Sequence, residues 1–213
     1  FRTHSDTEVL VNTIQQYGEK ALDKLRGMFG FAVWNEKEQT LMLARDFFGI
    51  KPVYYAQIDG HFVFASEIKS ILAFPGYERK VNQQALEQYL SFQYSPLEET
   101  FFKGIYKLMP GHILIYRQGR FEIKEYFHPY LEPKNDPAGE IEAEALQNRL
   151  RGVLRDSVEH HMLSDVEVGA FLSGGVDSGY LAAVSGADQA FTVGFDEGEH
   201  YSEVDRAKEV AQQ

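Results

Sequence analysis

The 213-residue sequence contains no cysteine. This absence excludes a disulfide framework, a zinc site built on thiolates and a thiol nucleophile within the sequence given. No apolar run approaches the ~20 residues that a membrane-spanning helix requires, and the first residues do not form the apolar core of a secretion signal. We therefore expect a soluble, cytoplasmic protein.

Positive charge is also scarce. Lys and Arg together number 21 against 32 Asp and Glu, so the net charge is -11. An acidic surface repels nucleic-acid backbones and anionic membranes, and no basic stripe offsets that repulsion here. Small molecules are the expected partners, whereas nucleic acid and membranes are not. The sequence leaves the oligomeric state open, a homodimer included.

Proline is sparse as well, with 7 in the chain, yet the stretch 129–140 (PYLEPKNDPAGE) is rich in it. That stretch has no periodic apolar pattern and therefore predicts an interdomain linker. The expected domains are residues 1–128 and 141–213. Because the chain opens without Met and ends inside a helical pattern, we expect it to be a piece of a longer protein.

The first domain should begin with a short amphipathic helix. Ser5 and Glu8 have the spacing of a capping box, and Gly18 supplies a C-terminal stop. The apolar positions of one helical stripe are Val9, Leu10, Ile14 and Tyr17.

Alternating apolar residues then predict strands joined as hairpins. The strongest hairpin signal is the two-residue turn Asp59-Gly60, and a second turn falls at Gln118-Gly119. The expected strands cover residues 29–34, 40–45, 53–56, 61–65, 112–117 and 120–127. Both strand faces are apolar, so we expect layers on both sides of the sheet. The helical stripes expected to cover one side are Ile68, Ile71 and Leu72, and Leu86, Tyr89 and Leu90. The first domain is thus predicted to be α+β with a largely antiparallel sheet.

The period changes in the second domain. Apolar residues recur at helical spacing from Leu146 to Met162, and the run 166–172, a tight turn and a helix from about Ser178 follow. A second apolar run, 190–195, leads to a helix that Ser202 is expected to cap. Strand, helix, strand and helix in this order predict parallel strands and the start of a doubly wound α/β domain.

The turn after the first apolar run has the parts of a phosphate cradle. Its glycines let N–H groups approach an oxyanion, its hydroxyls donate hydrogen bonds, and the helix start adds partial positive charge. The expected phosphate-binding residues are Ser173, Gly174, Gly175, Asp177 and Ser178. A carboxylate in such a cradle needs a bridging cation, so Asp177 is the expected Mg²⁺ ligand. The alternative is a plain turn in which Asp177 caps the helix.

The string Ser-Gly-Gly-Val-Asp-Ser at 173–178 resembles the PP-loop of ATP pyrophosphatases, and the longer string 165–178 is similar to glutamine-hydrolysing asparagine synthetases. Further stretches resemble the same family in the same order. These stretches are 5–9 (SDTEV), 25–32 (LRGMFGFA), 44–52 (ARDFFGIKP), 64–69 (FASEIK) and 107–112 (KLMPGH).

This resemblance implies an N-terminal-nucleophile (Ntn) glutaminase with a four-layer αββα fold, followed by a PP-loop synthetase. It implies a cysteine nucleophile upstream of Phe1 and therefore no catalytic residue within this sequence. It assigns Asp6 to the α-amino group of glutamine, although Asp6 could instead be a second helix cap beside Ser5. It assigns Leu172 and Val193 to the adenine of ATP, positions that core residues would also fill.

We interpret four charged residues of these strings as loop scaffolding or as members of ion pairs. Their spacing along the chain does not place a general base beside a nucleophile, so a catalytic role is not expected. They are Arg45, Asp46, Lys51 and Lys69.

The activity implied by the resemblance is ATP-dependent asparagine synthesis from aspartate and glutamine through β-aspartyl-AMP, with release of AMP and pyrophosphate. Two alternatives stay open: a relative with another acceptor, such as a β-lactam synthetase, and a module that binds glutamine or nucleotide without turnover. The acceptor pocket is expected beyond Gln213, so this sequence does not choose between acceptors.

Overall fold

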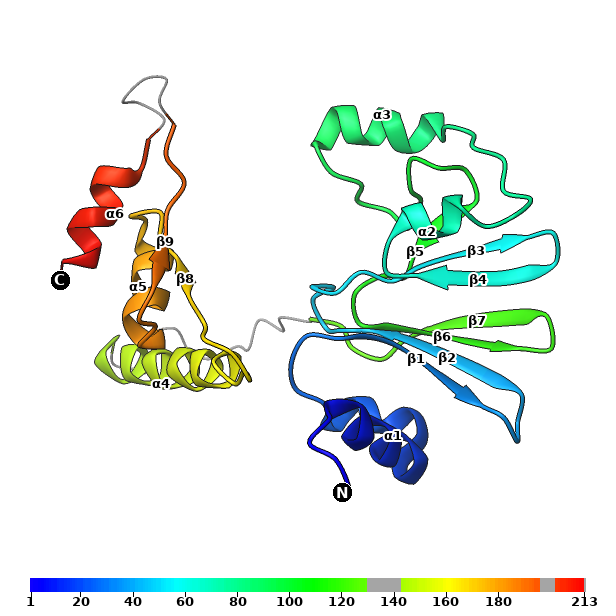
Figure 1. The fold of residues 1–213 in the computed structure, drawn as a ribbon, viewed down its shortest axis with the longest axis horizontal. Helices are drawn as coiled ribbons and strands as arrows, with labels where there is room; N and C mark the ends of the chain where they lie inside the picture. Colours follow the sequence, from blue (N-terminus) through cyan, green and yellow to red (C-terminus); the bar gives the residue numbers. More distant parts are fainter. Residues whose placement is uncertain (130–142, 196–201, 213) are drawn as a thin grey trace. The chain divides into compact units, whose positions relative to one another are not determined.

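The computed structural model describes residues 1–129, 143–195 and 202–212. The chain divides into two units, Phe1–Leu131 and Glu132–Gln213 (Figure 1). The linker expected at 129–140 lies, apart from Pro129, outside the described residues, and the expected domain limits stay predictions. None of the described helices is long and apolar enough to cross a membrane.

Helix α1 (Asp6–Tyr17) begins and ends where the sequence predicts. The Ser5 side chain accepts a hydrogen bond from the Thr7 amide at 3.2 Å, and Gly18 ends the helix with φ 59°. The predicted capping box is wrong. The Glu8 side chain does not bond to the Ser5 amide, because residues 2–3 lie over the helix start and their own donors bond to the Glu8 carboxylate. Its carboxylate accepts from the amides of Arg2 (2.8 Å) and Thr3 (2.7 Å), and bonds from the Thr3 hydroxyl and these amides lower the pKa of Glu8.

Two antiparallel sheets follow in the first unit. Sheet A has the order β1-β2-β6-β7, and sheet B has the order β4-β3-β5. The strands of sheet A are β1 (Gly30–Asn35), β2 (Thr40–Arg45), β6 (His112–Arg117) and β7 (Arg120–Glu125). Those of sheet B are β3 (Tyr54–Ile58), β4 (His61–Ala65) and β5 (Ile105–Lys107). The expected α+β class with antiparallel strands is confirmed.

Turn chemistry sets the register of these hairpins. Asp59 and Gly60 have φ of 47° and 80°, and Gln118 and Gly119 have φ of 50° and 80°. Two successive positive φ values match the right-handed twist of the flanking strands, so each turn closes a hairpin without a bulge.

The apolar residues of the first unit form three clusters, one between the two sheets and one on the outer face of each sheet. Between the sheets, Leu43 and Leu114 of sheet A meet Tyr55 of sheet B. On the outer face of sheet A, Ala44 and Ile113 pack against the 3-10 helix η1 (Gly18–Lys24) through Leu22. Neighbouring residues of β2 therefore face opposite layers, as strand geometry requires.

The outer face of sheet B packs on α2 (Ile68–Leu72), where Ile71 is fully buried against Ala56 and Ile105. The order of layers is thus helix, sheet, sheet, helix, and the expected αββα architecture is confirmed (Figure 1).

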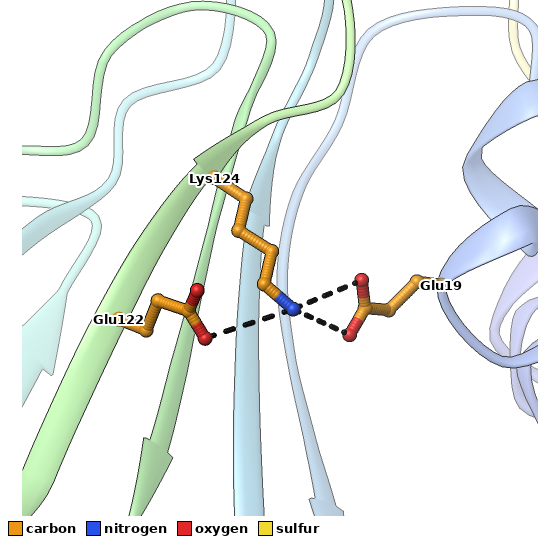
Figure 2. A network of polar contacts seen from close by, with 3 residues as sticks. All are labelled: Glu19, Glu122 and Lys124. Carbon is orange, nitrogen blue, oxygen red and sulfur yellow. Dashed lines mark hydrogen bonds and ion pairs between the residues drawn. The ribbon is translucent and has the colours of Figure 1, made fainter.

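An ion-pair network joins the outer layer to sheet A. The Lys124 ammonium on β7 lies 3.3 Å from the Glu19 carboxylate of η1 and 3.7 Å from Glu122 (Figure 2). The Glu19 carboxylate raises the pKa of Lys124. Because all three side chains are exposed, the network adds little to stability, and the packing of Leu22 is what holds η1 on the sheet.

Helix α3 (Gln83–Phe92) differs from expectation. The stripe of Leu86, Tyr89 and Leu90 does not cover the sheet, since Leu90 is 73% exposed and Ala85 is the buried residue. Helix α2 already occupies the outer face of sheet B. The Asn82 side chain caps α3 by accepting the Ala85 amide. The Tyr89 ring of α3 makes an edge contact with the Phe101 ring, and the two ring centroids lie 5.1 Å apart.

The second unit contains the expected βαβ arrangement. Strand β8 (Ala170–Phe171) pairs in parallel with β9 (Ala190–Phe191), and α5 (Val176–Ser185) connects them. Helix α4 (Ala143–His161) precedes β8, and α6 (Val204–Ala211) follows β9.

Two details of the second unit were predicted wrongly. The apolar runs 166–172 and 190–195 were expected to be strands, but β8 and β9 are only two residues long. Among the described residues β8 and β9 pair only with each other, so no third strand bonds to either one and extends it. Ser202 does not cap α6, whose N-cap is Glu203 without a side-chain bond, because the helix begins one residue later than the Ser202 spacing requires.

Candidate functional site

A pocket of about 710 Å³ opens beside the start of α1 in the first unit. It is lined by Asp6 and its neighbours on α1, by residues between Lys24 and Phe31, and by Lys51, Pro52 and Ser66. This volume lies in the range of small-molecule sites. All of the lining comes from stretches that resemble the glutaminase or border them.

Asp6 is an exposed wall residue of this pocket. Ser5 performs the capping, and the Asp6 carboxylate accepts a bond from the Thr7 hydroxyl at 3.3 Å. Within the described ranges no backbone amide binds the Asp6 carboxylate, so Asp6 is not a second helix cap. A carboxylate so placed suits an ammonium ligand.

Three cationic side chains line the same pocket, namely Lys24, Arg26 and Lys51. Among the described lining residues these cations outnumber the one acid, Asp6, although the net charge of the chain is -11. The arrangement suits a ligand that carries both a carboxylate and an ammonium group. Sequence reasoning missed Lys24 and Arg26, although Arg26 stands in a family-like string.

The loop after β2 is held by the side chain of Asp46, which is 1% exposed. Its carboxylate accepts the amides of Phe48 (3.2 Å), Ile50 (2.9 Å) and Lys51 (2.8 Å). A buried carboxylate is stable only when such donors replace water. The expected scaffolding role of Asp46 is therefore confirmed.

Arg45 ties the same loop to the sheet B segment. Its guanidinium donates to the carbonyls of Gly49 (2.7 Å), Lys51 (2.9 Å) and Leu108 (2.7 Å). Burial lowers the pKa of Arg45, with the Coulombic effect of Asp46 opposing that shift. Lys69 forms an exposed pair with Glu67. Scaffolding or pairing is thus confirmed for Arg45 and Lys69, whereas Lys51 is scaffolding through its backbone only.

The glycine-rich loop of the second unit lies between β8 and α5, as expected. The Ser178 side chain accepts the Ser173 amide (3.2 Å), lies 2.9 Å from the Ser173 hydroxyl oxygen and donates to the Gly175 carbonyl (3.2 Å). Gly175 is the N-cap of α5, so no side chain occupies the first-turn amides. Hydroxyls and amides of this kind fit the oxyanions of a phosphate chain.

Asp177 stands in the first turn of α5 with an exposed carboxylate. It makes no hydrogen bond or ion pair with any residue that the structure describes, so it is not a helix cap. Residues 1–129, 143–195 and 202–212 contain no cluster of three metal-ligating side chains. One carboxylate beside a phosphate cradle nevertheless fits Mg²⁺, which keeps several waters and takes its other ligands from substrate phosphates.

The two positions assigned to adenine differ in exposure. Leu172 is 3% exposed, and its carbonyl accepts the Thr192 hydroxyl at 2.7 Å, while Val193 is 66% exposed. Both follow the carboxyl ends of their strands, the edge where ligands of parallel sheets bind. The adenine role of both residues stays a prediction.

Residues 1–127 match the family model described as glutamine amidotransferase domain, and residues 149–213 match the model described as asparagine synthase. Asparagine synthetase [glutamine-hydrolyzing] 1 of Bacillus subtilis is 42% identical over 216 residues, covering 99% of this chain and 33% of its own length. Asparagine synthetase [glutamine-hydrolyzing] 3 of the same organism is 36% identical over 186 residues, covering 87% and 30%.

Among solved structures, the B. subtilis glutamine phosphoribosylpyrophosphate amidotransferase complexed with ADP and GMP matches 94% of this chain and 42% of its own, with 16% identity and a TM-score of 0.43. The chain belongs to the glutamine amidotransferase domain family. The resemblance to asparagine synthetases noted in the sequence is confirmed. The chain spans about a third of the length of these curated relatives.

Proposed function

We propose that the protein containing this chain is a glutamine-hydrolysing asparagine synthetase. The observation that carries the proposal is the order of two matched regions, a glutaminase-type αββα unit and an asparagine synthase segment, with a glycine- and serine-rich turn at the expected strand end of the latter. The two relatives that match 99% and 87% of this chain carry that activity in their names.

In the proposed reaction the side-chain carboxylate of aspartate attacks the α-phosphorus of ATP. The bond to the pyrophosphate oxygen breaks, giving β-aspartyl-AMP, and ammonia then displaces AMP to form asparagine. The amides at the start of α5 would hold the phosphates and stabilise the charge that develops on the leaving pyrophosphate, and the hydroxyls of Ser173 and Ser178, which bond to each other, would hold the turn in the shape that binds them.

Magnesium held by Asp177 would neutralise part of the phosphate charge. Leu172 and Val193 would contact the adenine, and Gly174 and Gly175 would let the backbone approach the phosphates. These assignments are supported by the Asp177 carboxylate, which is exposed and has no partner among the described residues, and by the position of the loop between β8 and α5.

Ammonia would come from glutamine in the first unit. Asp6 would bind the α-ammonium of glutamine in the pocket beside α1, whose cations suit the α-carboxylate. The nucleophile is expected to be a cysteine outside this chain, which contains none. The proposed substrates are therefore glutamine, aspartate and ATP.

Two variants of the full-length protein test the two halves of the proposal. Asp177→Ala should reduce aspartate-dependent ATP–pyrophosphate exchange by at least about 100-fold, since metal and phosphate positioning are lost together. Asp6→Asn should raise the KM for glutamine about tenfold or more while synthesis from free ammonia is unchanged. Normal exchange in Asp177→Ala would contradict the synthetase assignment, and an unchanged glutamine KM would contradict the role of Asp6.

Product analysis with aspartate, glutamine and ATP decides the acceptor. Asparagine as the product supports the proposal, whereas a cyclised or differently amidated product would indicate a related two-domain enzyme. The cytoplasmic location and a homodimer stay predictions.

A further inference from the structure

The phosphate-binding turn lacks a positive side chain of its own. Residues 173–178 contain no Lys or Arg, and Asp177 adds a negative charge. A helix start contributes only about half a unit of positive charge. A triphosphate bound here would therefore require a cation from another element in addition to the metal.

Helix α6 brings such a cation to the turn. Gly174 has φ of 74°, and a Cβ atom built on it would lie 2.6 Å from the Cβ of Arg206 and 3.0 Å from the amide nitrogen of Ala207. Ala207 is buried at 3% exposure. The first turn of α6 thus packs directly on Gly174, and the Arg206 side chain starts beside the turn.

The guanidinium of Arg206 is available for a ligand. Arg206 is exposed, and it makes no hydrogen bond or ion pair with any residue that the structure describes. The neighbouring Asp205 carboxylate lies 3.8 Å from Lys208 instead. Arg206 has no partner among the described residues and lies next to a glycine turn, so it differs from a cation that a surface ion pair holds in place.

We propose that Arg206 binds the β- and γ-phosphates of ATP, and the pyrophosphate formed from them, across the turn Ser173–Ser178. This inference rests on the proposed function of the turn. A guanidinium presents paired donors that match two phosphate oxygens, which a lysine ammonium does not reproduce. Arg206 is a phosphate-binding residue in this proposal and takes no part in proton transfer.

The test compares Arg206→Met, Arg206→Lys and the matched control Lys208→Met, which removes a cation two residues further along α6, in the full-length protein. Two quantities are measured for each protein: the inhibition constant for pyrophosphate and the affinity for adenosine. Adenosine has no phosphate, so its binding does not involve Arg206. Arg206→Met should weaken pyrophosphate binding about tenfold or more, Arg206→Lys should restore part of it, and Lys208→Met should match the parent protein. Adenosine affinity should be the same in all four proteins.

Unchanged pyrophosphate binding in Arg206→Met would overturn the proposal, and so would an equal loss of adenosine affinity, which would indicate damage to the packing of α6 on Gly174. The Asp177→Ala variant separates this inference from the function. If Asp177→Ala abolishes exchange while Arg206→Met binds pyrophosphate normally, only the role of Arg206 is wrong. If ATP–pyrophosphate exchange is also normal in Asp177→Ala, the proposed function itself is wrong.

Discussion

The hydroxyl oxygens of Ser173 and Ser178 lie 2.9 Å apart at the two ends of the turn that follows β8. Ser178 also accepts the Ser173 amide, so this one side chain closes the turn. The relationship shows why serines stand at both ends of the motif, since each hydroxyl fixes the other and leaves the amides between them free for a ligand.

Replacing Ser178 by Ala should open this turn. We expect the free energy of unfolding to fall by about 1 kcal/mol, the usual net value of such a bond, and the KM for ATP to rise several-fold. Ser185→Ala is the matched control, because Ser185 bonds the Ala182 carbonyl at the other end of α5. Calorimetric melting and exchange kinetics check both variants. An equal rise in KM for both would show that the turn geometry is not responsible.

Replacing Gly174 by Ala should be far more damaging than the same change at Gly186. Both glycines have positive φ, 74° and 63°, but a Cβ at Gly174 meets α6 whereas one at Gly186 meets nothing within 4 Å. Gly186→Ala should cost about 1 kcal/mol from backbone strain alone, and Gly174→Ala should add the displacement of α6 to that cost. Chemical denaturation measures the difference. Equal costs would mean that α6 does not pack on the turn.

Replacing Asp46 by Asn should destabilise the first unit by about 3 kcal/mol. The amide nitrogen of Asn cannot accept the donors that now reach both carboxylate oxygens, so at least one of these amides would lose its partner beside the buried side chain. Asp23→Asn is the control, since Asp23 is exposed on η1. Urea titration followed by the fluorescence of Trp34, the only tryptophan in the chain, reports on this unit. A cost below that of the control would contradict the scaffolding role.

Stability should fall at alkaline pH partly through Tyr126. Burial raises the pKa of Tyr126, with the Asp46 charge as a second cause. Above about pH 10 the unfolded chain releases the phenolic proton while the folded chain keeps it, so each further pH unit removes at most about 1.4 kcal/mol, less where solvent screens the ring.

Tyr126→Phe removes this pH dependence together with the 2.7 Å bond from its hydroxyl to the Arg45 carbonyl. We expect about 1 kcal/mol lower stability at neutral pH and a smaller loss between about pH 10 and 12. Tyr94→Phe, at an exposed position, should change neither quantity. Parallel alkaline slopes for Tyr126→Phe and the parent protein would refute the assignment.

Local patterns in the sequence predicted the elements whose geometry depends on neighbours along the chain. Asp59-Gly60 and Gln118-Gly119 placed two hairpins because those dipeptides tolerate positive φ, and Ser5 and Gly18 set the ends of α1. The Ser-Gly-Gly-Val-Asp-Ser turn was likewise found at its strand end, since its signal lies within six consecutive residues.

Contacts between distant residues were decided only by the tertiary structure. Spacing on α3 could not show that α2 already covers sheet B and leaves Leu90 exposed, nor could it show that Glu8 would meet the amides of residues 2–3. The approach of Arg206 to Gly174 joins residues 32 positions apart. Periodicity specifies which face of an element is apolar, but which partner that face meets depends on the packing of the whole unit.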